Sequence, residues 1–351
     1  MAFYRRLLTT AYGLVLCMAL TGCGQGLEQT NVKAGMDAVA AMDYDTALSA
    51  FETALTDGES ERSIYRGEGL AYLGKSMYSE SVDAFEKALA ASGEMVDSMD
   101  YDINYYLACA YEKNGDRTKA IAVYDAILAL KPKDLDALYL RGSLLLKQGD
   151  YENACKDFEV VLSLEPTNID RIVSICELLD NQGYQQIAKE YLEGTMAEEN
   201  AKKLTTFDLG RIYYYLEDYD NAKTNLEQAR DNTNPETALY LGKTYEALGD
   251  FNYAASVYNS YLQADAESAE VYNQLGLCKI KQGAYEEALT AFQTGMAIEG
   301  NDQMQSLSYN EIVAYEYLED YKKAAVLMEA YLAKYPDDEA AQREYLFLKT
   351  R

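Results

Sequence analysis

Apolar residues recur along most of this chain at the spacing of one helical face, in short segments separated by polar turns. The segment YENACKDFEVVLSLEP shows the pattern at six positions, which are Tyr151, Ala154, Cys155, Phe158, Val161 and Leu162. These positions share one face of a helix, and the preceding segment, LDALYLRGSLLLKQ, predicts a second helix that ends at the turn Gly149-Asp150. The chain has 4 prolines, and all of them fall at the borders of predicted helices rather than inside them.

The predicted helix pairs repeat along the chain. The stretches KQGDYENACKDF (147–158) and KQGAYEEALTAF (281–292) carry glycine, tyrosine and phenylalanine at matched offsets. The same pattern begins at residues 28, 62, 101, 135, 169, 203, 235, 269 and 305, and most steps are 34 residues long. A helix pair cannot bury its apolar face alone, so a repeated pair predicts a stack in which each pair packs on the next.

The unit resembles the tetratricopeptide repeat, a helix–turn–helix of about 34 residues. The copy from Leu135 supplies the residues typical of that family, which are Gly142, Gly149, Tyr151, Ala154, Phe158 and Pro166. The weakest copy starts at Ile169 and has Gln185 where tyrosine is expected. The resemblance implies an all-α, right-handed superhelical solenoid of about nine repeats over residues 28–337. A C-terminal capping helix is expected at 338–351, with Tyr345, Leu346 and Leu348 pointing inward.

The first residues predict an export signal. Arg5 and Arg6 precede an apolar run from Leu7 to Leu20, followed by small residues, which is the order of a secretory signal. This run is too short to favour a transmembrane helix. Leu20-Thr21-Gly22-Cys23 resembles the lipobox of bacterial lipoproteins.

That resemblance implies removal of residues 1–22 and attachment of a diacylglyceryl group, with palmitate-type chains, to Cys23. Residues 23–27 would then form a short tether to the outer face of the cytoplasmic membrane, or to the periplasmic leaflet in a two-membrane cell. A secretory signal with a chance cysteine is the alternative.

The composition of the chain disfavours several classes of partner and of catalytic site. The chain has 31 basic and 58 acidic residues, a net charge of −27, and no histidine. This charge disfavours nucleic acid as a partner, and the lack of histidine removes the commonest catalytic base and neutral metal ligand. No CxxC motif and no set of nucleophile, base and orienting group occurs, so we expect neither an enzyme nor a cofactor or metal site. Cys109, Cys155, Cys176 and Cys278 are expected in the core, and a Cys155–Cys176 disulfide is left open.

In the tetratricopeptide family the inner face is lined by the first helix of each repeat, mainly at positions 2, 5, 9 and 12. Large aromatic and basic residues there suit recognition, although packing between neighbouring first helices is the alternative. The candidates for partner binding are Tyr105, Tyr139, Phe207, Arg211, Tyr214, Lys243, Asn273 and Tyr309. No lysine occupies position 5, so the carboxylate clamp of chaperone-tail binders is not expected.

The sequence therefore predicts a membrane-anchored, extracytoplasmic scaffold that binds a protein or peptide, in cell-envelope assembly or secretion. A lipoprotein that binds a glycan or small solute through the tyrosines is the alternative. The identity of the partner and the oligomeric state are left open.

Overall fold

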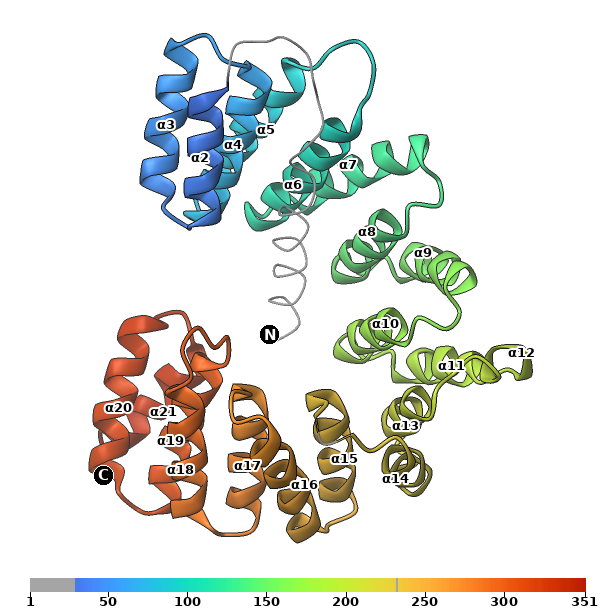
Figure 1. Ribbon diagram of the computed structural model, residues 1–351, viewed down its shortest axis with the longest axis vertical. Coiled ribbons are helices and arrows are strands. Elements are labelled where there is room, and N and C mark those ends of the chain that lie inside the picture. The colour runs from blue at the N-terminus through green and yellow to red at the C-terminus, as the bar shows by residue number, and fades with distance from the viewer. Residues whose placement is uncertain (1–28, 232) are drawn as a thin grey trace. The chain divides into compact units, whose positions relative to one another are not determined.

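A computed structural model describes residues 29–231 and 233–351. The predicted signal peptide (1–22), Cys23 and the tether (23–27) lie outside the described residues. Every regular element of the described part is an α-helix, and these helices pair into hairpins as the repeat predicts (Figure 1). We call the first helix of each hairpin helix A and the second helix B.

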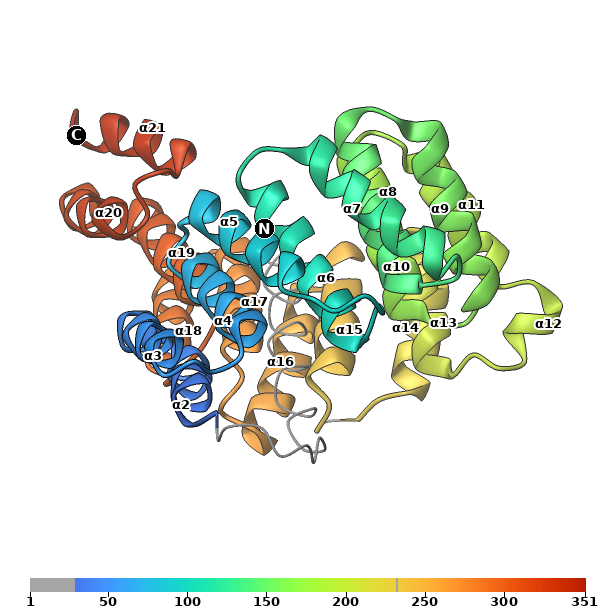
Figure 2. The same cartoon turned by 90° about the horizontal axis from the view of Figure 1, so that it is seen from above.

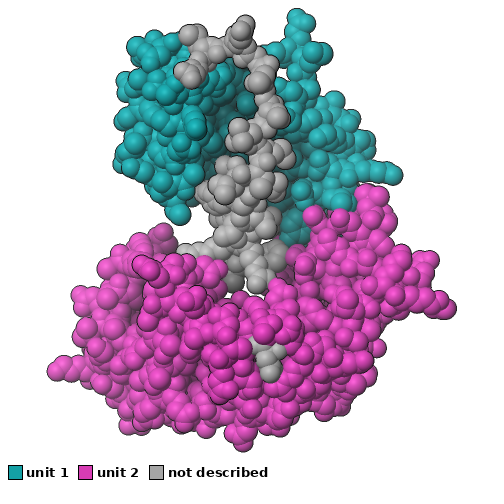
Figure 3. Space-filling model, in the orientation of Figure 1, with its two compact units in different colours: residues 1–158 teal, residues 159–351 magenta. Residues whose placement is uncertain are grey.

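The chain divides into two compact units, one ending at Phe158 and one running from Glu159 to Arg351, with the division inside α9 (Figure 3). The hairpins of the first unit are α2 (Thr30–Ala40) with α3 (Tyr44–Thr56), α4 (Glu61–Gly74) with α5 (Tyr78–Ala90), α6 (Ser98–Lys113) with α7 (Arg117–Leu130), and α8 (Leu135–Gln148) with α9 (Tyr151–Leu164).

The second unit continues the series. Its hairpins are α10 (Ile169–Asn181) with α11 (Gln185–Thr195), α13 (Thr206–Tyr215) with α14 (Tyr219–Gln228), α15 (Pro235–Ala247) with α16 (Phe251–Ala264), α17 (Ala269–Lys281) with α18 (Tyr285–Met296), and α19 (Met304–Tyr317) with α20 (Tyr321–Lys334). A short helix, α12 (Glu198–Ala201), follows α11, and α21 (Glu339–Leu348) follows the last hairpin. In this unit the A helices α10, α13, α15, α17 and α19 contact one another in order, which forms a continuous helix-A face (Figures 1 and 2).

The turn inside each hairpin confirms the predicted register. One residue of each turn has a positive φ, and these residues are Met42, Ser76, Gly115, Gly149, Gly183, Glu217, Gly249, Gly283 and Glu319. They recur with the same steps as the repeat starts predicted from the sequence. In six hairpins the next residue is an aspartate whose side chain accepts a hydrogen bond from the third N–H of helix B, as Asp150 does from Asn153. In these six hairpins the left-handed residue and the aspartate cap together start helix B.

Helix A approaches helix B closely at one glycine. A Cβ built on Gly142 would lie 2.6 Å from Cε1 of Phe158, and Gly276 meets Phe292 in the same way. Both phenylalanines are fully buried. At these two positions a larger side chain would overlap the aromatic ring, whereas the last repeat has Ile312 at this position and faces Met328 rather than phenylalanine.

The C-terminal helix α21 packs against the last hairpin through one stripe. Ala341 and Leu348 are buried with Met328 and Tyr331 in one core cluster, and Tyr345 packs against that cluster. The prediction that Leu346 points inward is wrong, since 66% of it is exposed. Residues 341, 345 and 348 follow helical spacing and lie on one stripe. Leu346 comes one residue after Tyr345 and is therefore turned about 100° away from that stripe. No helix among the described residues is long and apolar enough to cross a membrane.

Candidate functional site

The two candidates in the first unit connect neighbouring helices. Tyr139 is 6% exposed, and its ring lies 6.5 Å from that of Phe158. The half-buried Tyr105 donates a hydrogen bond of 2.5 Å to Oδ1 of Asp134, the residue that caps α8. Burial, followed by this carboxylate, raises the pKa of the Tyr105 phenol well above its usual value. In this arrangement little of the Tyr139 ring is available to a partner. The hydroxyl of Tyr105 is already used in its hydrogen bond to Asp134.

Four of the six candidates in the second unit lie together. Phe207, Arg211 and Tyr214 share one face of α13 because they are spaced four and three residues apart. The guanidinium carbon of Arg211 lies 5.4 Å from the centre of the Phe207 ring and 5.2 Å from the centre of the Tyr240 ring. Its Nη1 lies 2.7 Å from Oδ1 of Asp170, on α10. The guanidinium therefore contacts one carboxylate and two aromatic rings.

Tyr240, on α15, lies at the centre of this group and was missed by the sequence analysis. Its ring centre is 5.6 Å from that of Tyr214 and 6.1 Å from that of Tyr215, both packed edge to face. Lys243 Nζ lies 6.0 Å from the same ring. We call this set the Arg211 cluster; it comprises Asp170, Glu177, Phe207, Arg211, Tyr214, Tyr215, Tyr240 and Lys243.

Tyr215 closes the cluster on the side of α10. Its hydroxyl donates a hydrogen bond of 2.8 Å to Oε1 of Glu177 and lies 3.1 Å from the hydroxyl of Tyr240. Tyr240 and Tyr215 each come one residue after the repeat positions, 5 and 12, that the family pattern singles out. Extending the search by one residue along helix A would have found both.

Arg211 carries an unsatisfied hydrogen-bond donor. The residue is 7% exposed, and its Nε has no acceptor among the described residues. Burial lowers the pKa of the guanidinium, but Tyr240 and Asp170 outweigh burial, so the pKa lies above its usual value. Burial also raises the pKa of Tyr214 to about 12, with smaller contributions from Tyr219 and Tyr240. The cluster thus holds a buried cation against two adjacent aromatic rings.

The remaining candidates lie on other hairpins. Asn273, on α17, accepts a hydrogen bond of 2.8 Å from Nδ2 of Asn310, on α19. Tyr309 is half-buried, and its ring packs edge to face on Tyr331 at 5.7 Å. Among the described residues, neither Asn273 nor Tyr309 makes a ring contact or a hydrogen bond with the Arg211 cluster. A search of the described part also finds no group of side chains that could hold a metal ion.

Family models described as "Tetratricopeptide repeat" match residues 32–95, 107–174, 207–269 and 246–308. The chain is a tetratricopeptide repeat protein. The matches fall in both units and include α13 and α15, which carry most of the Arg211 cluster.

Two solved structures and one curated protein resemble this tetratricopeptide repeat protein. Yeast Tom70 has a TM-score of 0.53 and 13% identity, with 91% of this chain and 80% of that chain covered. A tetratricopeptide repeat protein from Parabacteroides merdae has a TM-score of 0.46 and 16% identity, over 72% of this chain and 98% of the other. BBSome complex member BBS4 from Bos taurus is 32% identical over 82 residues, which are 23% of this chain and 16% of that protein. The chain therefore spans about a sixth of that relative, and the structural likeness shows the fold.

Proposed function

We propose that this protein captures a protein or peptide segment on the helix-A face of its second unit, at the Arg211 cluster. The observation that carries the proposal is the buried Nε of Arg211, which has no acceptor within the described chain. An unmade hydrogen bond at a buried donor costs about 1–3 kcal/mol, and such groups in native proteins call for a functional explanation. A carbonyl or carboxylate oxygen of a partner would complete the hydrogen bonding of the guanidinium.

Access to this atom requires a small rearrangement. Nε is shielded from solvent, and the guanidinium packs against the adjacent rings of Phe207 and Tyr240. One of these rings must turn aside when a partner binds, which is a common scale of change at protein interfaces. Tyrosine and arginine also dominate binding energy at such interfaces, because they bury a large area and keep a polar end. Tyr214 and Lys243 are half-buried, and they would form the first contacts.

The location of the protein is a further part of this proposal. The order of residues in 1–22 and the lipobox-like Leu20-Thr21-Gly22-Cys23 support export and a lipid anchor at Cys23. We propose an extracytoplasmic, membrane-anchored scaffold that serves cell-envelope assembly or secretion. Replacing Cys23 with alanine tests the anchor: it should abolish incorporation of radiolabelled palmitate, and continued labelling would rule out Cys23 as the lipidated residue.

Site-specific photo-crosslinking tests partner capture. A photoreactive amino acid at position 243 should crosslink a defined protein in membranes, whereas the same group at Lys223 on helix B (α14) should not. Tyr214→Ala should weaken the crosslink at 243, and Tyr253→Ala on α16 is the matched control. Identical crosslinked products from 243 and 223 would contradict the proposal.

Glycan binding is the competing function. The rings of Tyr214, Tyr215 and Tyr240 pack edge to face on one another, which leaves little flat aromatic surface for a sugar. Calorimetric titration with cell-wall fragments distinguishes the two. Heat of binding that is lost in Tyr214→Ala, together with no protein crosslink at 243, would favour the glycan.

A further inference from the structure

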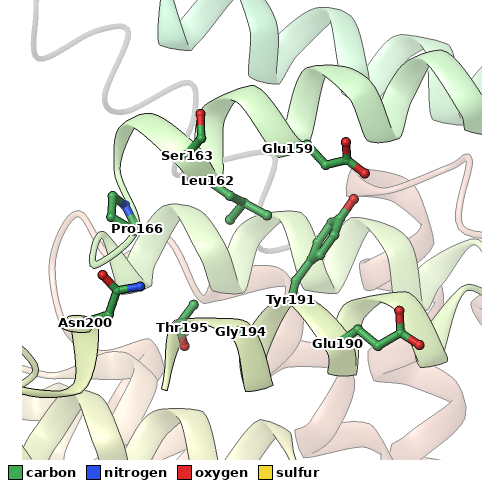
Figure 4. Close-up of a pocket in the computed structure, with 9 residues that line it drawn as sticks. All are labelled: Glu159, Leu162, Ser163, Pro166, Glu190, Tyr191, Gly194, Thr195 and Asn200. Carbon is green, nitrogen blue, oxygen red and sulfur yellow. The ribbon is translucent and has the colours of Figure 1, made fainter. Parts of the chain in front are cut away.

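A hollow of about 310 Å³ lies between helices B of two successive hairpins (Figure 4). Its walls come from the C-terminal half of α9, from α11, and from α12. All of its lining residues belong to the second unit. No residue of the predicted partner-binding set or of the Arg211 cluster lines it.

The hollow lies beside the C-terminal end of α11, which is shorter than the preceding helix B. Helix α9 has 14 residues, whereas α11 has 11 and ends at Thr195. Gly194 occupies the repeat position that Val160 occupies in α9. A Cβ built on Gly194 would meet nothing within 4 Å. Gly194 therefore places no side chain in the space beside the end of α11.

The lining of the hollow changes character from one end to the other. Figure 4 shows the carboxylate of Glu159 and the hydroxyl of Tyr191 on the same side, while Pro166 and Asn200 lie toward the other end. Leu162 lies between these ends, and Glu190, next to Tyr191, supplies a second carboxylate. Both glutamates are exposed, and neither lysine nor arginine is among the lining residues.

We propose that this hollow binds an arginine side chain of a protein partner. The apolar stem of arginine would lie on Leu162, and its planar head would reach the Glu159 carboxylate beside the Tyr191 ring. A fork of N–H donors suits a carboxylate, and guanidinium groups stack on aromatic rings. The volume lies at the lower end of the range of ligand pockets, which suits one long side chain rather than a whole cofactor. The net charge of −27 on the chain also favours a basic partner.

The test uses a photoreactive peptide, acetyl-Gly-Arg-Gly-amide with a diazirine, and the full-length protein in detergent. Mass spectrometry should place the label on α9 or α11 around the hollow. Gly194→Phe should reduce this labelling by about tenfold, because the ring fills the space, while Gly194→Ala should retain it. Both variants should keep the helical circular dichroism signal, since each replaces a helical glycine that faces open space.

Charge controls separate this site from general attraction to an acidic protein. A double variant, Glu159→Gln with Glu190→Gln, should reduce labelling severalfold. The control double variant, Glu286→Gln with Glu299→Gln, removes the same charge from exposed positions elsewhere and should leave labelling unchanged. An equal fall in both pairs, or labelling that persists in Gly194→Phe, would overturn the proposal. Equal labelling by a lysine or norleucine peptide would overturn the assignment of arginine.

Discussion

Gly142 and Phe158 are in such close contact that a Cβ at position 142 would lie 2.6 Å from Cε1 of the ring. Alanine favours a helix over glycine by about 1 kcal/mol, so propensity alone would make Gly142→Ala stabilising. We expect the opposite, a loss of about 1–3 kcal/mol in the free energy of unfolding, because the ring is fully buried and must shift. Unfolding in urea, followed by circular dichroism, measures the loss.

The chain itself suggests the compensating change. Where this helix-A position is larger than alanine, the facing helix-B position is not aromatic: Cys176 pairs with Leu192 by repeat position, and Ile312 with Met328. Phe158→Leu should therefore relieve much of the cost of Gly142→Ala. A double-mutant cycle with strictly additive losses would show that the contact is not the cause.

Glu217 holds the left-handed turn position that glycine occupies in five of the other hairpins, with φ +61°. A residue with a Cβ pays about 1–2 kcal/mol in this conformation, whereas glycine adopts it freely. Glu217→Gly should accordingly raise the free energy of unfolding by about 0.5–1 kcal/mol after the entropy of glycine is included. Gly149→Ala, at the same position of another turn, should lower it. Melting curves of both variants against the parent decide the sign.

The repeat positions that depend on contacts inside one hairpin could be predicted from the sequence. Gly142, Phe158 and the turn at Gly149 follow from local geometry that recurs in each copy, and the structure places all three as expected. The same reasoning placed Phe207, Arg211, Tyr214 and Lys243 on helices A, and these four do gather in one cluster.

Features that depend on how hairpins pack on one another were not predicted. Tyr240 lies one residue past the expected inward position, and its ring meets Arg211 and Phe207 across the contact between α15 and α13. The hollow beside Gly194 is lined by α9, α11 and α12, and the repeat pattern does not predict where α11 ends or that α12 follows it. Leu346 was assigned from its hydrophobicity, whereas its position on α21 turns it outward.

The four cysteines of the described chain are free thiols, and three of them are buried. Burial is the main cause that raises the pKa of Cys176 to about 12 and that of Cys278 to about 11. Because the thiolate is the reactive form, alkylation of these two in the native protein should be far slower than in denaturant. Mass spectrometry of iodoacetamide-treated protein maps each site. Cys109, which is half-buried, is the comparison within the same protein. Rapid alkylation of Cys176 in the native protein would contradict its placement in the core.

Glu316, on α19, makes the last hairpin sensitive to pH. Its carboxyl is partly buried, and Oε1 has no hydrogen-bond partner among the described residues. Burial, then the neighbouring Glu344 on α21, raises the pKa of Glu316 to about 7 from its ordinary value of 4.5. Burial, and then the charges of Glu344 and Glu316, also raise the pKa of Tyr309 on the same helix. The protonated form of Glu316 is therefore the one that fits the folded state.

The sign of the pH dependence follows from this raised pKa. The stabilising contribution of Glu316 is fully present below the unfolded pKa and is lost as pH rises through about 7. Glu316→Gln should match the parent near pH 4.5 and exceed its stability at pH 8 by about 1 kcal/mol, a figure reduced for solvent screening of a partly exposed group. Glu329→Gln, an exposed position on α20, is the control and should show no such pH-dependent gain. Thermal melts of the three proteins at both pH values give the answer, and parallel pH curves for parent and Glu316→Gln would show that the carboxyl pair does not act on stability.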